Sequence, residues 1–364
     1  MMKASVVREF GGGFHTEEVT LADPTGREVL VEVKASGLCH SDELAHQTNL
    51  GYDVPVVFGH EVAGVAIEVG PNVTDIQVGD HVVGCLVQYC GACVKRLTGQ
   101  VFLCENPGAT LRTPDATSRI FDADGKDLKQ GMGLGGFAER ALIHENQLTR
   151  IPKEMPFPQA CLLGYGVVTG AGAAINTANV RAGDTVAVIG TGGVGLNTFS
   201  GAVIAGASRI IAIDVADENL ETAKKFGATD VINSKNTDPV EAVRDLTGGG
   251  VDHAFDLVGA FGQTRNGYDM LAKGGGRYLI GLLDAENSIE LSSFESLTSL
   301  KHVHGVYMGS TVHKRDIPMV ANLYLQDRYE LDSLVSKEIS IDEVQTGYEA
   351  LADPNTNRVV ITSF

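Results

Sequence analysis

A glycine-rich segment followed by an acidic residue is the most specific chemical pattern in this chain. Gly190, Gly192 and Gly195 form a G-x-G-x-x-G motif directly after the apolar run 185–190. In such a motif the first glycine permits a tight turn, the second lets the backbone approach a pyrophosphate, and the third allows close contact between helix and strand. Asp214 ends the next apolar run, 19 residues after Gly195, where a carboxylate can bind the ribose hydroxyls of an adenine nucleotide. The pattern predicts a dinucleotide-binding site.

The same acidic residue indicates which dinucleotide is bound. A carboxylate at Asp214 would repel the additional phosphate of NADP, so the pattern favours NAD(H). The N–H groups at the start of the following helix, near Gly193, would bind the phosphates. A glycine-rich turn beside an unrelated surface aspartate is the alternative, and it is disfavoured because strand, glycines, helix and acid all fall in register. NAD(H) in turn predicts hydride transfer.

Cysteine and histidine spacing indicates metal chemistry in other parts of the chain. Three of the six cysteines lie within fifteen residues of one another, namely Cys90, Cys93 and Cys104. This spacing favours a metal clip over thiols scattered through a core. The tripeptide Gly59-His60-Glu61 begins 20 residues after Cys39, and thiolate and imidazole are both zinc ligands. A core cysteine and a hydrogen-bonded histidine would be the ordinary interpretation of either residue alone.

The elements that must position these residues fall into two groups. Short apolar runs separated by turn residues predict a mainly β region up to about residue 160, with strands at 29–37, 63–70 and 81–87. A helix is expected at 167–177, and strands then alternate with helices up to about 305. The predicted strands are 185–190, 209–214, 230–233, 253–259 and 276–282, and the predicted helices include 193–206 and 217–227. Such alternation predicts a parallel sheet covered by helices on both faces.

Length and charge narrow the class of protein further. A chain of 364 residues exceeds what one core usually holds, so two domains are expected. The net charge of −18 disfavours nucleic acid and anionic membrane surfaces as partners. The chain shows no apolar run of the roughly 18 residues that span a bilayer and no signal-peptide pattern at its start, which together predict a cytoplasmic protein.

The segment GHEVAGVAIEVG at 59–70 resembles the zinc signature of the alcohol dehydrogenases in the medium-chain dehydrogenase/reductase superfamily. The resemblance extends to 117–145, to the dinucleotide motif and to the closing RVVITSF. It implies an α/β protein with a GroES-like β-rich catalytic domain at 1–166 and 306–364. It also implies a Rossmann domain, a doubly wound parallel sheet that binds NAD, at 167–305. Relatives with a similar long loop form homodimers by joining the edges of two such sheets, here near 276–282 or 286–305.

The resemblance also assigns expected roles to individual residues. Cys39 and His60 would bind a catalytic zinc, and Ser41 would pass on the proton of an alcohol substrate. Residues expected to contact the cofactor, besides the glycines and Asp214, are His40, Thr169, Val194, Val258 and Arg358.

Two departures from the family pattern put both zinc sites in question. The family's third catalytic ligand is a cysteine, and this chain has Tyr165 at that position. A tyrosine ligates zinc poorly because its phenol has an ordinary pKa near 10. Glu61 offers a substitute ligand, as in some polyol-type relatives. In the cysteine-rich segment the family's third ligand is replaced by Arg96, whose guanidinium keeps its charge and cannot bind zinc. Zinc occupancy stays open at both sites.

Three functions remain compatible with these residues. The first is NAD(H)-dependent interconversion of an alcohol and an aldehyde or ketone, with or without catalytic zinc. The second is zinc-independent reduction of a conjugated C=C bond in an enal or enone, with Tyr165, Ser41 or His60 as a donor to the substrate. The third is nucleotide binding without catalysis. Tyr165 is either a catalytic hydroxyl or a side chain that fills a vacated metal site. The substrate is expected to be an apolar small molecule.

Overall fold

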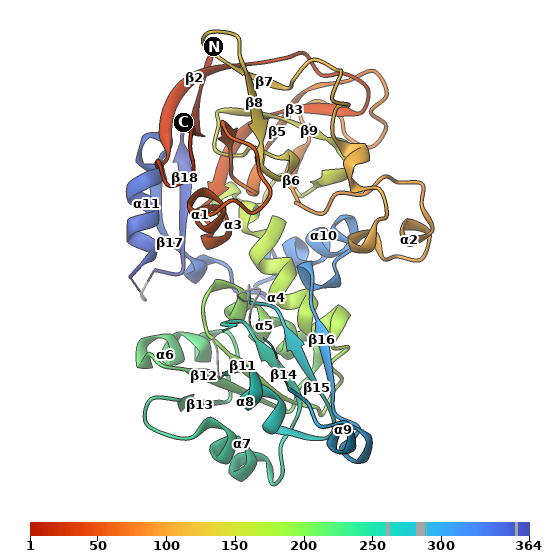
Figure 1. Ribbon diagram of the computed structural model, residues 1–364, viewed down its shortest axis with the longest axis vertical. Helices are drawn as coiled ribbons and strands as arrows, with labels where there is room; N and C mark the ends of the chain where they lie inside the picture. The colour runs from red at the N-terminus through yellow and green to blue at the C-terminus, as the bar shows by residue number, and fades with distance from the viewer. Residues whose placement is uncertain (260–262, 282–287, 289, 354–355) are drawn as a thin grey trace. The chain divides into compact units, whose positions relative to one another are not determined.

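The computed structural model describes residues 1–259, 263–281, 288, 290–353 and 356–364. Two compact units form, one from Met1–Tyr165 with Val312–Phe364 and the other from Gly166–Thr311. Both units are drawn in Figure 1, which labels most of their helices and strands. Each unit has its own sheets, and together they confirm the predicted α/β class, with one β-rich unit and one parallel-sheet unit.

The first unit contains a small closed barrel beside a larger sheet. The barrel order is β1-β2-β7-β8-β4. Its strands are β1 Met2–Val7, β2 His15–Leu21, β4 Val56–Val57, β7 Ile120–Asp122 and β8 Asp127–Gln130. The seven-stranded sheet has the order β10-β6-β5-β3-β18-β17, and β9 pairs with β3. Its strands are β3 Glu28–Gly37, β5 Glu61–Val69, β6 His81–Gly84, β9 Arg140–His144, β10 Leu148–Arg150, β17 Val335–Ser340 and β18 Arg358–Ser363.

Strand β3 organises the larger sheet because its valines are buried in the core while its polar residues alternate with them. Val29, Val31 and Val33 are buried, as expected for a strand whose side chains point alternately to two faces. It pairs antiparallel with β5, and this register places Gly37 opposite Glu61. The end of β3 and the start of β5 therefore carry the two predicted zinc-signature segments side by side.

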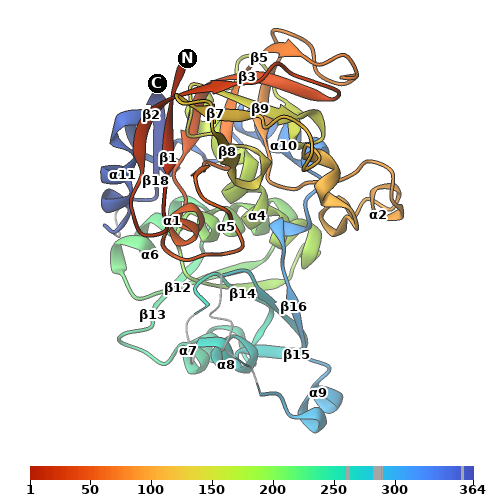
Figure 2. The same ribbon diagram turned by 45° about the horizontal axis from the view of Figure 1, so that its top comes forward.

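The helices of the first unit are short. They are α1 His40–Gln47, α2 Val94–Leu97, α3 Phe157–Leu162, α10 His313–Tyr324 and α11 Val344–Leu351. Figure 2 shows α11 close to β18 in the blue C-terminal segment.

The helix expected at 167–177 begins ten residues earlier. It runs over Phe157–Thr177 as α3, a π-helical turn at Leu163–Val167, α4 at Val168–Gly172 and a second π-helical turn at Ala173–Thr177. This helix is long and apolar enough to cross a membrane, so the expectation that no apolar run reaches that length was wrong. Since 78% of its apolar window is buried within the protein, it is a core helix. The cytoplasmic location stays a prediction.

The second unit is built on a parallel six-stranded sheet of order β13-β12-β11-β14-β15-β16. The strands are β11 Thr185–Ile189, β12 Arg209–Asp214, β13 Asp230–Asn233, β14 Val251–Asp256, β15 Leu271–Leu279 and β16 His302–Gly305. The helices are α5 Gly193–Ala205, α6 Asp217–Lys225, α7 Pro239–Thr247, α8 Gln263–Asp269 and α9 Ser293–Ser299. Figure 2 shows α5 on one side of the sheet and α7 and α8 on the other, which is the predicted doubly wound arrangement.

Candidate functional site

The candidate catalytic residues of the first unit lie at the ends of its strands and on its long helix. Cys39 is the buried N-cap residue of α1, directly after β3. His60 immediately precedes β5 and is 1% exposed. Tyr165 lies in the first π-helical turn. Contacts of Cys39 and Tyr165 with His60 bring together residues that are more than 100 positions apart in sequence.

His60 forms a buried pair with a carboxylate that the sequence had not singled out. Its Nδ1 atom lies 2.9 Å from Oδ2 of Asp42, and both side chains are 1% exposed. Burial alone would lower the pKa of His60, but the neighbouring Asp42 and Cys39 raise that pKa well above its ordinary value. Asp42 therefore fixes the orientation of the imidazole and favours its protonated form.

Ser41 and Tyr165 share one hydrogen bond. The serine Oγ lies 3.3 Å from the phenolic oxygen, and either atom can be the donor. Both side chains are partly exposed. Burial and the nearby Cys39 raise the pKa of Tyr165, so the phenol keeps its proton at neutral pH. Because one hydroxyl donates to the other, the accepting hydroxyl keeps a proton that it can donate to a third atom.

The catalytic zinc ligands inferred from the family do not form a complete set. Glu61 is buried, and its Oε2 atom lies 3.5 Å from Nε of Arg358. Among the described residues, one group of three or more His, Cys, Asp or Glu side chains has all its ligand atoms within 4.8 Å of one another, and that group is not Cys39, His60 and Glu61. A catalytic zinc normally has three protein ligands. The donor set around Tyr165 thus does not fit a catalytic zinc.

Cys161 does not replace the ligand missing at Tyr165. Its thiol is fully buried and donates to the backbone carbonyl of Pro158 at 3.2 Å, within α3. Burial raises the pKa of this thiol well above its ordinary value, which disfavours the thiolate that zinc requires.

The group that does meet the metal criterion is formed by Cys90, Cys93 and Cys104. Sγ of Cys93 lies 3.8 Å from Sγ of Cys104, which is about the separation of two thiolates that each lie ~2.3 Å from a tetrahedral zinc. Backbone N–H groups of Arg96 and Glu105 hydrogen-bond to Cys93 and lower its pKa to about 7. The three thiols fit a zinc ion with one open position.

The dinucleotide motif of the second unit has the backbone geometry that its glycines predict. Gly190 follows β11 with φ +94°, a conformation that favours glycine. A Cβ atom on Gly195 would lie 2.1 Å from the carbonyl oxygen of Gly190, so helix α5 packs against the turn only because this position has no side chain. Gly192 is the N-cap of α5, and the first turn of α5, with Gly193 and Val194, follows it.

Asp214 ends β12 next to this turn. Its Oδ2 atom accepts hydrogen bonds from the N–H of Thr191 at 2.9 Å and from the Thr191 hydroxyl at 2.7 Å. Burial would raise the pKa of Asp214, but these and other hydrogen bonds lower it, so the carboxylate is ionised. The arrangement can receive a dinucleotide with its phosphates at the helix start and its ribose at the acid.

The loop after β14 is held by Asp256, an acid that is 1% exposed. Asp256 accepts hydrogen bonds from the N–H groups of Val258 and Gly259 at 3.1 and 3.0 Å, and it pairs at 2.5 Å with Arg277, whose side chain is fully buried. These bonds end the strand at Asp256, three residues before the predicted end of 259, and leave the Val258 side chain 49% exposed.

The remaining residues predicted to contact the cofactor, Thr169, His40 and Arg358, differ in burial and in the element that carries them. Thr169 is buried in α4, where its hydroxyl contacts Sδ of Met308 at 3.7 Å. His40 is exposed at the start of α1, and Arg358 is buried beside Glu61. Sequence reasoning missed Asp42, Thr191 and Asp256. Asp42 could have been found from its place three residues after Cys39 in the sequence, whereas the partners of the other two depend on strand order.

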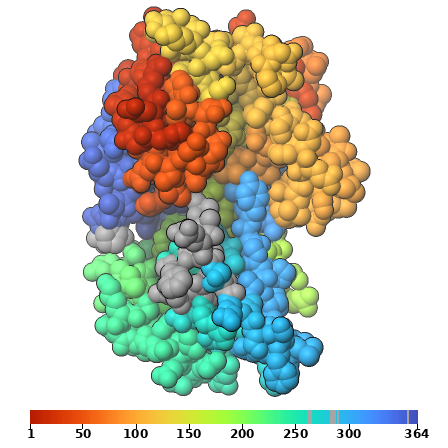
Figure 3. Space-filling model, in the orientation of Figure 1, coloured from red at the N-terminus to blue at the C-terminus, as the bar shows by residue number. Residues whose placement is uncertain are grey.

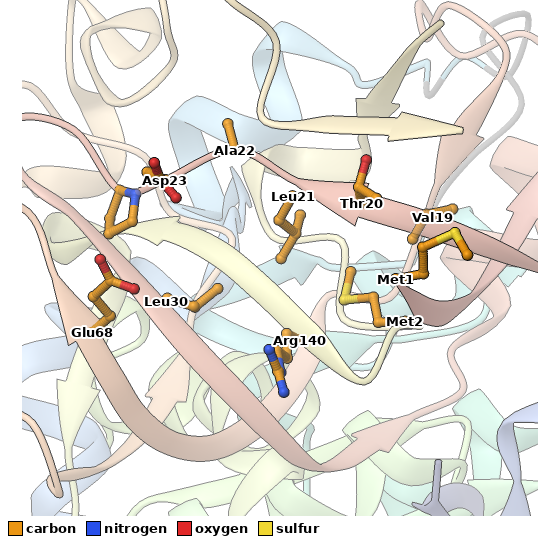
Figure 4. Close-up of a pocket in the computed structure, with 11 residues that line it drawn as sticks. Met1, Met2, Val19, Thr20, Leu21, Ala22, Asp23, Leu30, Glu68 and Arg140 are labelled. Carbon is orange, nitrogen blue, oxygen red and sulfur yellow. The ribbon is translucent and has the colours of Figure 1, made fainter. Parts of the chain in front are cut away.

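A cavity of about 300 Å³ in the first unit lies apart from these residues. Figure 4 shows Met1, Met2 and Val19 at one end of this cavity and Asp23, Leu30 and Glu68 at the other. None of its lining residues was predicted to bind substrate, metal or cofactor.

Comparison with known proteins identifies the family of this chain. The chain matches the family model for the alcohol dehydrogenase GroES-like domain over residues 25–153 and the model for zinc-binding dehydrogenase over residues 193–326. It is 34% identical to S-(hydroxymethyl)glutathione dehydrogenase of Paracoccus denitrificans over 99% of both chains. The relative of this name from Synechocystis is 36% identical, again over 99% of both chains.

Solved structures give the same result. An alcohol dehydrogenase zinc-binding domain protein from Burkholderia ambifaria has a TM-score of 0.96 and 34% identity, over 100% of this chain and 99% of that one. Benzyl alcohol dehydrogenase from Acinetobacter calcoaceticus has a TM-score of 0.92 and 33% identity over the same shares. The chain belongs to the medium-chain, zinc-type alcohol dehydrogenase family. It is an oxidoreductase of the alcohol dehydrogenase type.

Proposed function

We propose that this enzyme is an NAD(H)-dependent alcohol/aldehyde oxidoreductase in which the hydroxyls of Ser41 and Tyr165 bind the substrate oxygen in place of a catalytic zinc. The observation that carries the proposal is the Ser41–Tyr165 hydrogen bond, at 3.3 Å, beside the buried His60–Asp42 pair. The family resemblance would put a catalytic metal at Cys39, His60 and the position of Tyr165. The two pairs supply a proton donor and a cationic neighbour, both of which stabilise negative charge on an oxygen.

The proposed reaction balances with one hydride and one proton. When bound, NADH supplies a hydride to the carbonyl carbon of an aldehyde. Tyr165 or Ser41 donates its hydroxyl proton to the carbonyl oxygen, and the remaining hydroxyl of the pair stabilises the oxygen that lost it. The protonated His60, held by Asp42, favours the charge that develops on that oxygen. In the reverse direction the same pair accepts the proton of the alcohol.

We assign the cysteine-rich segment a different role. Cys90, Cys93 and Cys104 would hold one structural zinc, with water at the position that Arg96 leaves open. Arg96 is exposed. The expected zinc content is then one ion per chain.

An apolar aromatic aldehyde is the proposed substrate class. Two considerations support it: the chain has no tryptophan and few aromatic residues to narrow a pocket, and a structural relative is a benzyl alcohol dehydrogenase. A conjugated C=C reductase is the second candidate, favoured by a phenol that is held protonated and can donate its proton to the α-carbon after hydride reaches the β-carbon.

Cinnamaldehyde with NADH separates the two candidates in one assay. Reduction of its carbonyl gives cinnamyl alcohol, and reduction of its double bond gives hydrocinnamaldehyde. The proposal expects cinnamyl alcohol as the main product. Hydrocinnamaldehyde as the main product would replace the first function with the second, and the absence of turnover on cinnamaldehyde and benzaldehyde would contradict both.

A second copy of this chain is the proposed partner of the second unit. Strand β16 is the last strand of the sheet, and Figure 3 shows its light-blue segment at the surface. Next to it Phe294, Leu297 and Leu300 are 76, 73 and 70% exposed. Residues 286, 287 and 289 of the predicted edge segment lie outside the described residues. Light scattering should give twice the 38.4 kDa chain mass, and the mass of one chain would contradict the dimer.

A further inference from the structure

A single threonine in the dinucleotide motif is tied to the acidic residue that follows it. Thr191 stands between Gly190 and Gly192 and is 1% exposed. It gives both of its donors to one atom, since its N–H and its hydroxyl reach Oδ2 of Asp214 at 2.9 and 2.7 Å. The glycine-rich turn and the acid at the end of the next strand are thus joined through one residue.

The second oxygen of Asp214 is also engaged by the protein. Oδ1 accepts hydrogen bonds from the N–H groups of Val215 at 2.7 Å and Ala216 at 3.0 Å, with Asn219 Nδ2 at 3.5 Å. Four of these five bonds to Asp214 are 3.0 Å or shorter, so the protein itself holds both carboxylate oxygens in place. The orientation of the carboxylate is therefore set before a nucleotide arrives, and the Thr191 hydroxyl is the one side-chain donor on Oδ2 among the described residues.

Fixing this carboxylate has a consequence for cofactor choice. An aspartate that can rotate away removes its charge from the ribose and makes room for a 2′-phosphate, whereas a fixed one keeps the charge in place. Hydrogen bonds to a charged group are the stronger ones, so the Thr191 hydroxyl contributes substantially to that fixation.

We propose that Thr191 is a specificity-determining residue of this enzyme, which positions the Asp214 carboxylate so that NAD(H) is bound and NADP(H) is rejected. This inference rests on the proposed NAD(H) dependence and adds to it a residue that acts through Asp214. The backbone N–H would be present with any residue at 191 except proline, so the hydroxyl is the part that threonine contributes.

The direct test is Thr191→Val, which keeps the shape of the side chain and removes its hydroxyl. Dissociation constants for NADH and NADPH are measured from the fluorescence of the reduced nicotinamide itself. We expect NADH to bind about tenfold more weakly, NADPH to bind as well as before or better, and the preference for NADH to fall at least tenfold. Thr191→Ser retains the hydroxyl and should restore most of the preference.

Strand β11, which leads into the glycine-rich turn, offers a matched control at its start. Thr185 donates its N–H and its hydroxyl to Oδ2 of Asp252, both at 2.8 Å. Thr185→Val removes the same kind of bond at the start of β11, and it should lower the melting temperature without changing the NADH/NADPH preference. A loss of preference in Thr185→Val equal to that in Thr191→Val would show a general structural effect and would overturn the proposal.

Asp214→Ser distinguishes failure of this inference from failure of the proposed cofactor site. If Asp214→Ser removes the NADH preference and Thr191→Val leaves it within twofold of the parent value, Thr191 has no positioning role. If Asp214→Ser also leaves the preference unchanged, the assignment of the acid to the ribose is wrong, and with it the basis of NAD(H) specificity.

Discussion

The dinucleotide motif and the Ser41–Tyr165 pair beside His60 differ in how many of their polar groups are hydrogen-bonded within the protein. Asp214 receives four short hydrogen bonds from neighbouring protein atoms. Ser41 and Tyr165 share one bond of 3.3 Å and retain a hydroxyl proton to donate. A group that receives several such bonds is held in one geometry by the fold itself. An unsaturated pair of hydroxyls beside a buried imidazole indicates the place where a substrate atom completes the bonding.

The largest expected effect is at Tyr165. Tyr165→Phe removes the hydroxyl proposed to donate to the substrate, and kcat for benzaldehyde reduction by NADH should fall by about a thousandfold. The dissociation constant for NADH should stay within twofold, since the motif lies in the other unit. Steady-state kinetics and NADH fluorescence measure the two quantities.

The control for this variant is Tyr348→Phe. Tyr348 is buried in the first unit, and its hydroxyl has no hydrogen-bond partner among the described residues. Its loss should change kcat less than threefold. Equal rates for Tyr165→Phe and the parent enzyme would mean that Tyr165 only fills space.

A large loss of stability is expected when the buried Asp256 loses its partner Arg277. Arg277→Met leaves Asp256 charged and unpaired in the sheet, and the free energy of unfolding should fall by about 3 kcal/mol. Urea unfolding followed by circular dichroism measures it. The double variant Arg277→Met with Asp256→Asn should recover more than half of the loss, and no recovery would refute the charge-pair explanation.

A smaller effect is expected from pH at Glu28, a saturated acid of the first unit. Burial alone would raise the pKa of Glu28, but hydrogen bonds from Arg112, Thr25 and Arg119 lower that pKa from 4.5 to about 2. The carboxylate therefore stabilises the fold above about pH 4.5, and this contribution, about 2 kcal/mol, is lost as the pH falls toward 2. Urea unfolding between pH 6 and 3 should show that the free energy of unfolding falls less steeply in Glu28→Gln than in the parent enzyme. The same pH dependence in both proteins would contradict this role.

The smallest effect is expected at Gly192. It distinguishes the glycines that the motif needs to fold from those that it needs to bind NADH. A Cβ on Gly192 meets no atom within 4 Å, whereas a Cβ on Gly195 would meet the Gly190 carbonyl at 2.1 Å. Gly192→Ala should keep the melting temperature and weaken NADH binding about tenfold, because the methyl group would meet the pyrophosphate. Gly195→Ala should lower both, and a normal NADH affinity in Gly192→Ala would move the phosphate site elsewhere.

Local patterns predicted β11, β12 and β13 of the second unit well because these strands are short, apolar and bounded by turn residues. The strand at 230–233 has its predicted bounds, and the strand predicted at 185–190 ends one residue earlier, at Ile189. The predicted end of β14 was wrong because Asp256 binds the N–H groups of Val258 and Gly259 and turns the chain away from the strand. The early start of the long helix was missed because Gly164 and Gly166 weaken the helical pattern before residue 167.

The candidate catalytic site was less predictable because its contacts cross the fold. The substitution at Tyr165 is visible in the sequence, but its bond to Ser41 joins residues 124 positions apart. Glu61 was an available zinc ligand by type, and only the structure places it beside Arg358. Residue types indicated the chemistry, whereas strand register decided which groups meet.

Zinc stoichiometry tests the central claim most directly. The full chain, purified without a metal-affinity tag or chelator, is analysed for zinc per active chain, in parallel with the Cys39→Ser variant. A catalytic site that uses Tyr165 and Ser41 predicts no more than one zinc per chain, and the same content in Cys39→Ser. Two zinc ions per chain, or the loss of one ion in Cys39→Ser, would contradict it.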